Sequence, residues 1–266
     1  MCQFVTNVVK LFVCGSMSQI FYICSMDVKE IIEKGNSSFL PNLSIDIVII
    51  GYKSNVLKCL LLKIGHKWVL PGGYVRFDQS VDEAVQNILN QRTGLENTYL
   101  KFLAVFGDKN RQFDNEMKEV FKKKEMEWRK DYWLNNRFVS LAYYSLVNMD
   151  KTHSFVGHFD EALMWFDFDD LPEMWMDHKS MLNTARQRLN EDIRHEQMTY
   201  NLLPKEFTMP ELHQLHQVIL EEKIDRSRFQ KKMLATGMFE RLPKLEKSTP
   251  GRNPYQYRLK KNSNPI

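Results

Sequence analysis

Hydrophobic and polar positions follow two different periods through the first two thirds of the chain. Uninterrupted apolar runs of strand length, bounded by polar or glycine-containing turns, predict β-strands. These runs cover 44–53, 57–65, 99–107, 138–147 and 162–173, the last running into a turn. Lys53, Ser54 and Asn55 provide a turn between the first two, and a further short strand ends at Pro71, Gly72 and Gly73.

Helical periodicity appears between these strands, over 27–35, 80–92 and 178–194. In the second helix Ser80 is a good N-cap, and Glu83 three residues later completes a capping box. Asp82 and Glu83 then lie in the first turn, where the helix dipole favours acids. The buried stripe is expected to contain Val81, Ala84, Val85, Ile88 and Leu89. Strands that alternate with helices predict an α/β domain over roughly 40–195.

The segment 108–136 is long for a connection between two strands and is densely charged. Loops of that length are functional or disordered when they contain no secondary structure. This one contains helix-forming and aromatic residues. We therefore expect a partly helical excursion beside the sheet.

The pattern changes after residue 200. A helix over 208–222 begins with Thr208 and an early proline, and a second over 225–237 begins with Asp225 and ends at a glycine. Two short alternating strands, MFERL and YQYRL, flank a polar loop. This order predicts a winged helix-turn-helix domain. The inward side chains of the second helix should be Phe229, Met233 and Leu234, whereas His213 and His216 are expected to be exposed.

Basic charge is concentrated in this last domain. Residues 223–261 contain twelve Lys and Arg against three acidic residues, a net charge of +9, whereas the whole chain has +4. Such a concentration is typical of nucleic-acid binding, and the second helix is the element expected in the major groove. The alternative is a solvated basic face on a small interaction domain. The candidate DNA-binding residues are Arg226, Ser227, Arg228, Gln230, Lys231, Lys232, Lys247 and Arg252.

The stretch from Gly73 to Leu95 resembles the Nudix box, G-x5-E-x7-R-E-U-x-E-E-x-G-U with U aliphatic. The structural positions match at Gly73, Leu89, Gly94 and Leu95. The positions that carry chemistry do not match, because they are occupied by Gln79, Asn87, Ile88, Gln91 and Arg92. Nudix hydrolases hold divalent metals with those carboxylates. We therefore expect the fold without catalytic residues, metal or cofactor.

A degenerate box followed by this C-terminal module resembles the Nudix-related transcriptional regulators, over about 40–260. The segments RFVSLAYYSLV and LLPKEFTMPELHQLHQVILEEKIDRSRFQKKMLATGMFE are especially similar to that family. The resemblance implies a Nudix-type α/β/α sandwich with a mixed sheet, which senses an effector, and a winged helix that binds operator DNA as a homodimer. Regulation of sugar use, with a sugar effector, is favoured over ADP-ribose because the diphosphate-cleaving residues are erased. Candidate ligand-binding residues are Gly72, Gly73, Gln79 and Arg137.

Three expectations complete this interpretation. Residues 1–38 form an N-terminal extension, with Met17 or Met26 as alternative start positions, followed by a sensing domain over 39–198 and a DNA-binding domain over 199–266. The four cysteines lack metal-site spacing and should be reduced thiols of a cytoplasmic protein with no membrane segment. The alternative function is a divergent Nudix hydrolase acting on a nucleoside diphosphate derivative.

Overall fold

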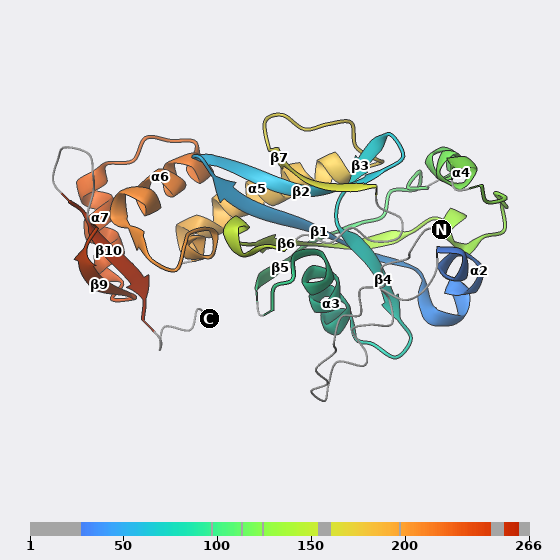
Figure 1. The fold of residues 1–266 in the computed structure, drawn as a ribbon, viewed down its shortest axis with the longest axis horizontal. Helices are drawn as coiled ribbons and strands as arrows, with labels where there is room; N and C mark the ends of the chain where they lie inside the picture. Colours follow the sequence, from blue (N-terminus) through green and yellow to red (C-terminus); the bar gives the residue numbers. More distant parts are fainter. Residues whose placement is uncertain are drawn as a thin grey trace, which may run out of the picture.

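A mixed seven-stranded sheet forms the centre of the protein (Figure 1). The computed structural model describes residues 28–96, 98–112, 114–123, 125–153, 161–196, 198–245 and 253–260. The strands of the sheet are β1 (Phe39–Lys53), β2 (Val56–Ile64), β3 (Lys67–Val69), β4 (Gly72–Arg76), β5 (Tyr99–Phe106), β6 (Val139–Leu146) and β7 (Ala162–Asp167).

Strand β1 is the central element, because it pairs with three others. It runs parallel to β6 and antiparallel to β2 and β4. Strand β2 also pairs with β3 and β7, and β5 pairs with β6 at the edge. The predicted turn between β1 and β2 is confirmed: Ser54 and Asn55 have φ of 53° and 61°. Those positive values suit a tight hairpin turn.

Helices cover both faces of the sheet, which confirms the predicted α/β/α arrangement. Helix α3 (Val81–Thr93) packs against Ile45, Ile47 and Ile49 of β1. Helix α5 (His178–His195) packs in the cluster that contains Val48 and Ile50. Side chains of a strand alternate between faces, so β1 needs apolar residues on both sides and reads as a nearly continuous apolar run.

Helix α3 has the caps that its sequence predicts. The Ser80 side chain accepts from the Glu83 N–H, and Glu83 accepts from the Ser80 N–H in return. Gly94 ends the helix with φ of 68°, a left-handed conformation that favours glycine. The buried stripe is confirmed at Ala84, Val85, Ile88 and Leu89, while Val81 is partly exposed.

The long 108–136 segment is partly helical, as expected. It forms α4 (Asp114–Lys123) and a short 3-10 helix η1 (Trp133–Asn135), and both pack with α2 (Val28–Ser38) in one cluster. Trp133 Nε1 donates a 2.9 Å hydrogen bond to the Ile31 carbonyl. The predicted end of the first helix at residue 35 is wrong. The helix continues to Ser38, and Gly35 lies under the Trp133 indole, where a side chain would not fit.

The C-terminal part forms the expected winged helix. Helices α6 (Met209–Leu220) and α7 (Arg226–Ala235) pack together, and β8 (Phe207–Thr208), β9 (Phe239–Lys244) and β10 (Tyr255–Leu259) form a three-stranded sheet in the order β8-β10-β9. Thr208 and Glu211 form a capping box for α6, and Asp225 caps α7 by accepting from the Arg228 N–H.

The two parts share one hydrophobic core. It extends from β1 and α5 through the 3-10 helix η3 (Thr199–Leu202) into α6, α7 and β10. The short 3-10 helix η2 (Met149–Lys151) follows β6 beside this junction. In Figure 1, α5 runs from beneath β3 to α6. No helix in the described ranges is long and apolar enough to cross a membrane.

The contact between Gly35 and Trp133 sets a test of the packing between α2 and η1. In an open helix, Gly35→Ala should stabilise the protein by about 1 kcal/mol. Here a Cβ would lie 2.1 Å from the Trp133 ring, so we expect urea denaturation to show a loss of roughly 1–3 kcal/mol. In a Trp133→Ala background the loss should disappear. A loss that persists there would contradict this packing.

Candidate functional site

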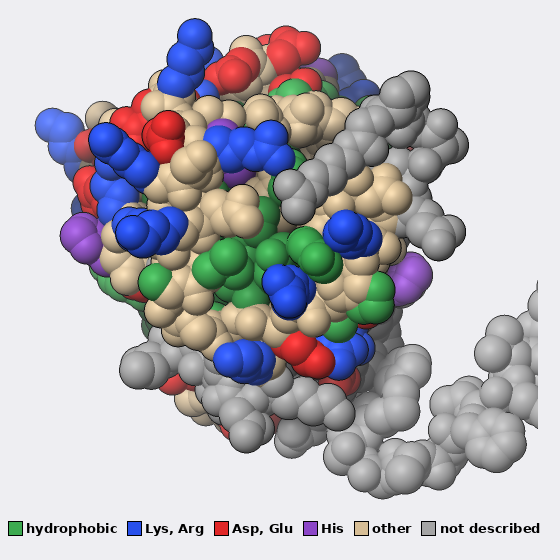
Figure 2. Space-filling model, turned by 90° about the vertical axis from the view of Figure 1, so that its left-hand side faces the viewer, with side chains coloured by type: hydrophobic (Ala, Val, Ile, Leu, Met, Phe, Trp, Pro, Cys, Tyr) green, Lys and Arg blue, Asp and Glu red, His purple; other side chains and the backbone are tan. Residues whose placement is uncertain are grey.

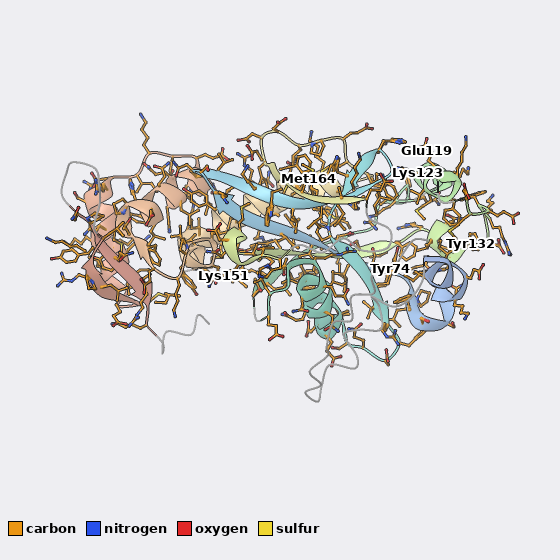
Figure 3. The ribbon with its side chains drawn as sticks, viewed as in Figure 1. Tyr74, Glu119, Lys123, Tyr132, Lys151 and Met164 are labelled. Carbon is orange, nitrogen blue, oxygen red and sulfur yellow. The ribbon has the colours of Figure 1, made fainter. Side chains whose placement is uncertain are left out.

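A cavity of about 150 Å³ lies between the central sheet and the 108–136 segment. Its lining is mainly apolar, with a few charged and polar side chains. Figure 3 shows that Tyr74, one of the lining residues, lies at the end of the molecule that carries α4 and Tyr132, away from the winged helix. The lining residues are Ser44, Ile45, Asp46, Leu62, Ile64, Val69, Leu70, Gly72, Gly73, Tyr74, Arg92, Arg111, Met117, Leu134, Trp175 and His178.

A buried ion network forms the polar side of the cavity. Asp46 of β1 is 7% exposed, and its Oδ2 lies 2.9 Å from Nη2 of Arg111, which is 3% exposed. The Arg111 Nε lies 3.1 Å from Oδ1 of Asp177, and Ser140 Oγ also donates to Asp46. A buried charge is tolerated only when it is paired. Here Arg111 forms ion pairs with two carboxylates, those of Asp46 and Asp177.

His178, the first residue of α5, presents a neutral imidazole to the same cavity. The Leu70 N–H donates to its Nδ1 at 2.9 Å, so Nε2 carries the proton of the neutral ring. Burial lowers the pKa of His178, with Arg111 acting in the same direction against Asp46. Its Nε2 lies 3.9 Å from Asp46 Oδ1, too far for a hydrogen bond. The cavity therefore offers a donor and an acceptor side by side.

The structure brings together two of the four residues predicted to bind a ligand. Gly72 and Gly73 line the cavity, and a Cβ at Gly72 would lie 2.8 Å from Asp46 Oδ1. Gln79 follows β4 and is not among the lining residues. The structure does not bring Arg137 to the cavity either, because its guanidinium donates to the Gly107 carbonyl at 2.7 Å.

The residues at the Nudix-box positions do not fit a divalent metal. Ile88 is buried against Gly73, and Arg92 lines the cavity with a cation. Gln79, Asn87 and Gln91 offer amides where the pattern has acids or arginine. No group of three or more His, Cys, Asp and Glu suited to a metal occurs in the part of the chain that the structure describes.

Helix α7 presents a polar, largely basic surface. Phe229 and Met233 are buried as predicted, but Leu234 is 41% exposed, so its assignment to the core is wrong. It lies one position beyond the narrow stripe that faces α6. The exposed set on α7 contains Arg226, Ser227, Arg228, Gln230, Lys231 and Lys232. Lys247 and Arg252 lie outside the described residues. Figure 2 views this end of the molecule and shows Lys and Arg around a hydrophobic patch.

The two histidines of α6 are packed rather than exposed, which corrects the prediction for both. His216 is 5% exposed, and its Nε2 is 3.0 Å from Oγ1 of Thr199. His213 Nε2 lies 2.8 Å from the Ile224 carbonyl. Both rings pack on the Phe229 ring, with centroid distances of 5.1 Å for His213 and 4.8 Å for His216. They join α6, α7 and η3.

Several cavity residues were missed in the sequence. One signal was available: Asp46 interrupts an apolar strand, and a charge in such a position must have a buried partner. No pattern identified Arg111 as that partner, because it lies 65 residues away in an irregular segment. Asp177 and His178 were hidden in the same way, since they look like the ordinary first turn of a helix.

Comparison with known proteins gives matches over both parts of the chain. Residues 199–259 match the family described as the NrtR DNA-binding winged helix domain. The ADPR responsive transcriptional repressor NtrR of Acinetobacter baylyi is 24% identical over 209 residues, which is 75% of each chain. The Shewanella oneidensis NrtR structure with a 27mer DNA aligns with a TM-score of 0.64 and 22% identity, covering 82% of this chain and 93% of that one.

A MutT/nudix family protein from Enterococcus faecalis also has the same fold, with a TM-score of 0.59 and 20% identity over 94% of this chain and all of that one. The fold and the degenerate box thus define a protein with a Nudix-type domain followed by a winged helix. More specifically, the chain is similar to the NrtR proteins in two ways: residues 199–259 match their winged helix domain, and most of the chain aligns with them in sequence and in fold.

The buried His216 predicts a loss of stability in acid. Burial, aided by Lys232 and His213, lowers its pKa from 6.5 to about 4. The native state then binds fewer protons than the unfolded state below pH 6.5. The contribution is complete above that pH and lost as the pH falls towards 4, by up to about 3 kcal/mol.

Urea denaturation of the native sequence and of His216→Asn at pH 7 and pH 5 measures this contribution. We expect the variant to lose less stability between the two pH values than the native sequence does. His195→Asn is the matched control, because His195 is exposed at the end of α5. An equal pH dependence in the native sequence and His216→Asn would contradict the prediction.

Proposed function

We propose that this protein is a DNA-binding transcriptional regulator whose Nudix domain binds a small-molecule effector without cleaving it. The observation that carries the proposal is the match of residues 199–259 to the NrtR DNA-binding winged helix domain. The charge pattern supports it independently, because residues 223–261 have a net charge of +9 and the face of α7 that projects from the domain is basic.

Arg and Gln side chains on α7 suit the edges of bases in the major groove. Arg226, Arg228 and Gln230 can read donor and acceptor patterns, while Ser227, Lys231 and Lys232 suit phosphates. All six are exposed. Lys247 and Arg252, which lie outside the described residues, remain candidate DNA-binding residues, as the sequence predicts.

We propose ADP-ribose as the effector. The Acinetobacter baylyi relative is named as ADPR responsive, and the cavity offers apolar surface for a base together with polar groups for a ribose. The expectation of a sugar effector and of control over sugar use receives no support from the comparisons. Of the four candidate ligand-binding residues predicted from the sequence, Gly72 and Gly73 are the proposed contacts, because they line the cavity.

The resemblance implies that the regulator acts as a homodimer on a palindromic operator. The sequence pattern adds a sensing domain over 39–198, a DNA-binding domain over 199–266 and a cytoplasmic location. The divergent hydrolase remains the second candidate. It is disfavoured because Ile88 and Arg92 stand where metal-binding carboxylates are required. Light scattering of the purified chain measures the oligomeric state.

Fluorescence anisotropy with DNA from the promoter beside the protein's own gene tests the function. We expect specific binding whose affinity changes when ADP-ribose is added and does not change with pentoses or hexoses. Weak binding that depends on salt alone and not on sequence would contradict a regulator. Metal-dependent hydrolysis of ADP-ribose by the same preparation would support the hydrolase instead.

The double substitution Arg226→Ala and Arg228→Ala tests the DNA-binding helix. Each contact of this kind is worth about 1–3 kcal/mol, so we expect operator binding to weaken by roughly tenfold or more, with a smaller salt dependence. Circular dichroism and the melting temperature should not change, because both side chains are exposed. Lys179→Ala with Arg188→Ala removes two exposed cations from α5 and is the matched control. Full operator binding by the α7 variant would rule out this helix assignment.

A further inference from the structure

Arg92 occupies an unusual position for a cation. It lies in the last turn of α3, at the position where the Nudix pattern has the second glutamate of its metal-binding pair. The structure places it in the cavity lining, which also contains the β4 glycines Gly72 and Gly73. A positive side chain therefore stands where a hydrolase of this fold would place a cation bound by acids.

The rest of the cavity is unsuited to a negatively charged group. Arg111, which is buried, is paired with both Asp46 and Asp177. The two carboxylates outweigh one guanidinium, and the lowered pKa of His178 keeps that ring neutral. An anionic part of a ligand is repelled from Asp46 and attracted towards Arg92. A base or sugar suits the opposite side, where Asp46 and His178 offer an acceptor and a donor.

We propose that Arg92 binds the diphosphate of the effector directly, in place of the metal ions of a Nudix hydrolase. The guanidinium has donors in a planar fork that matches phosphate oxygens. It neutralises diphosphate charge but does not activate a water molecule, as a bound metal does. The ligand is therefore held and not cleaved. This inference rests on the proposed ADP-ribose effector and adds that its binding is independent of metal.

Isothermal titration of the full chain with ADP-ribose, in EDTA and in Mg²⁺, tests the metal independence. We expect dissociation constants within about twofold of each other. Arg92→Gln keeps a polar side chain of similar length but removes the charge. This variant should raise the dissociation constant of ADP-ribose by roughly tenfold or more. The dissociation constant of adenosine, which has no phosphate, should stay within about twofold of the native value. Arg76→Gln is the control, because Arg76 lies at the end of β4 outside the cavity lining and pairs with Asp78.

Four results would overturn the inference. A requirement for Mg²⁺ would show that metal still mediates phosphate binding. Undiminished ADP-ribose binding by Arg92→Gln, or an equal loss for adenosine, would remove the role of Arg92 and leave the regulator proposal standing. No binding of ADP-ribose by the native chain would overturn the proposed effector and this inference together.

Helix α5 connects the cavity to the winged helix, through contacts that do not involve Arg92. This helix has 18 residues, a length of about 27 Å at 1.5 Å per residue. Its first residue, His178, and its N-cap, Asp177, belong to the cavity network. The Asp177 side chain makes no capping hydrogen bond; its carboxylate is turned to Arg111 instead. The start of α5 is therefore tied to the state of the cavity.

The middle of α5 contacts the end of α6 and the turn before α7. Arg186 Nη2 lies 2.6 Å from Glu221 Oε1, and Asn190 Nδ2 donates to the Ile219 carbonyl at 3.1 Å. Both partners precede Asp225, the N-cap of the proposed DNA-binding helix. Leu182 and Leu189 of α5 are buried in the common core, so the helix has apolar support between these two ends.

We infer that α5 transmits effector binding to the turn between α6 and α7. A ligand couples two sites only through an element whose arrangement both sites influence, and α5 contacts both. This inference also rests on the proposed function, and it assigns Arg186 and Asn190 as coupling residues that contact neither ligand nor DNA. The measured quantity is the ratio of operator dissociation constants with and without saturating ADP-ribose.

Arg186→Ala combined with Asn190→Ala should reduce that ratio at least roughly fivefold towards one, while the affinity for ADP-ribose without DNA stays within about twofold. Arg188→Ala is the matched control on the same helix. The Arg188 side chain is exposed and forms an ion pair with Glu191 of α5 itself, so its loss should not change the ratio. A double variant with the native ratio would overturn the inference alone. A native ratio of one would overturn the proposed regulation and this inference with it.

Discussion

The ion pair between Asp46 and Arg111 connects the parts of the structure that matter for function. Asp46 lies on the central strand, Arg111 lies in the 108–136 segment, and the same guanidinium reaches Asp177 before α5. Removing either member of a buried pair leaves an uncompensated charge, which costs several kcal/mol. The segment therefore does not behave as an optional surface loop. It supplies the cation that allows a carboxylate inside the sheet.

The same segment also closes the cavity with apolar side chains. Met117 and Leu134 contribute to its wall, and Trp133 connects the segment to α2. The 108–136 segment thus supplies a compensating charge near its start, at Arg111, and apolar side chains for a small hydrophobic cluster further along. The Nudix-type core alone would leave this side of β3 and β4 open. The cavity is therefore formed by this segment together with the sheet.

The regular elements could be predicted from the sequence, because their signals are local. The capping boxes at Ser80 and Thr208 and the apolar runs of the strands depend on neighbours in the chain. Gly35 and His216 were misjudged because a distant partner decides each of them: the Trp133 indole ring and a threonine on η3. The cavity was half visible for the same reason. Its glycines belong to a motif, whereas Arg111 belongs to none.

The continuous core at the junction has a consequence for how the C-terminal domain can be used. Leu202 and Leu203 lie within the segment that matches the winged helix domain, yet they are buried in the cluster that also contains Val48 of the central sheet. A cut at residue 199 divides the amino-acid sequence between two domains but also divides one packed interior. The DNA-binding part is thus poorly suited to transplantation onto another sensor, because a graft would expose apolar surface on both pieces. Under the proposed function, DNA specificity is better exchanged by replacing the outward side chains of α7 within the intact chain.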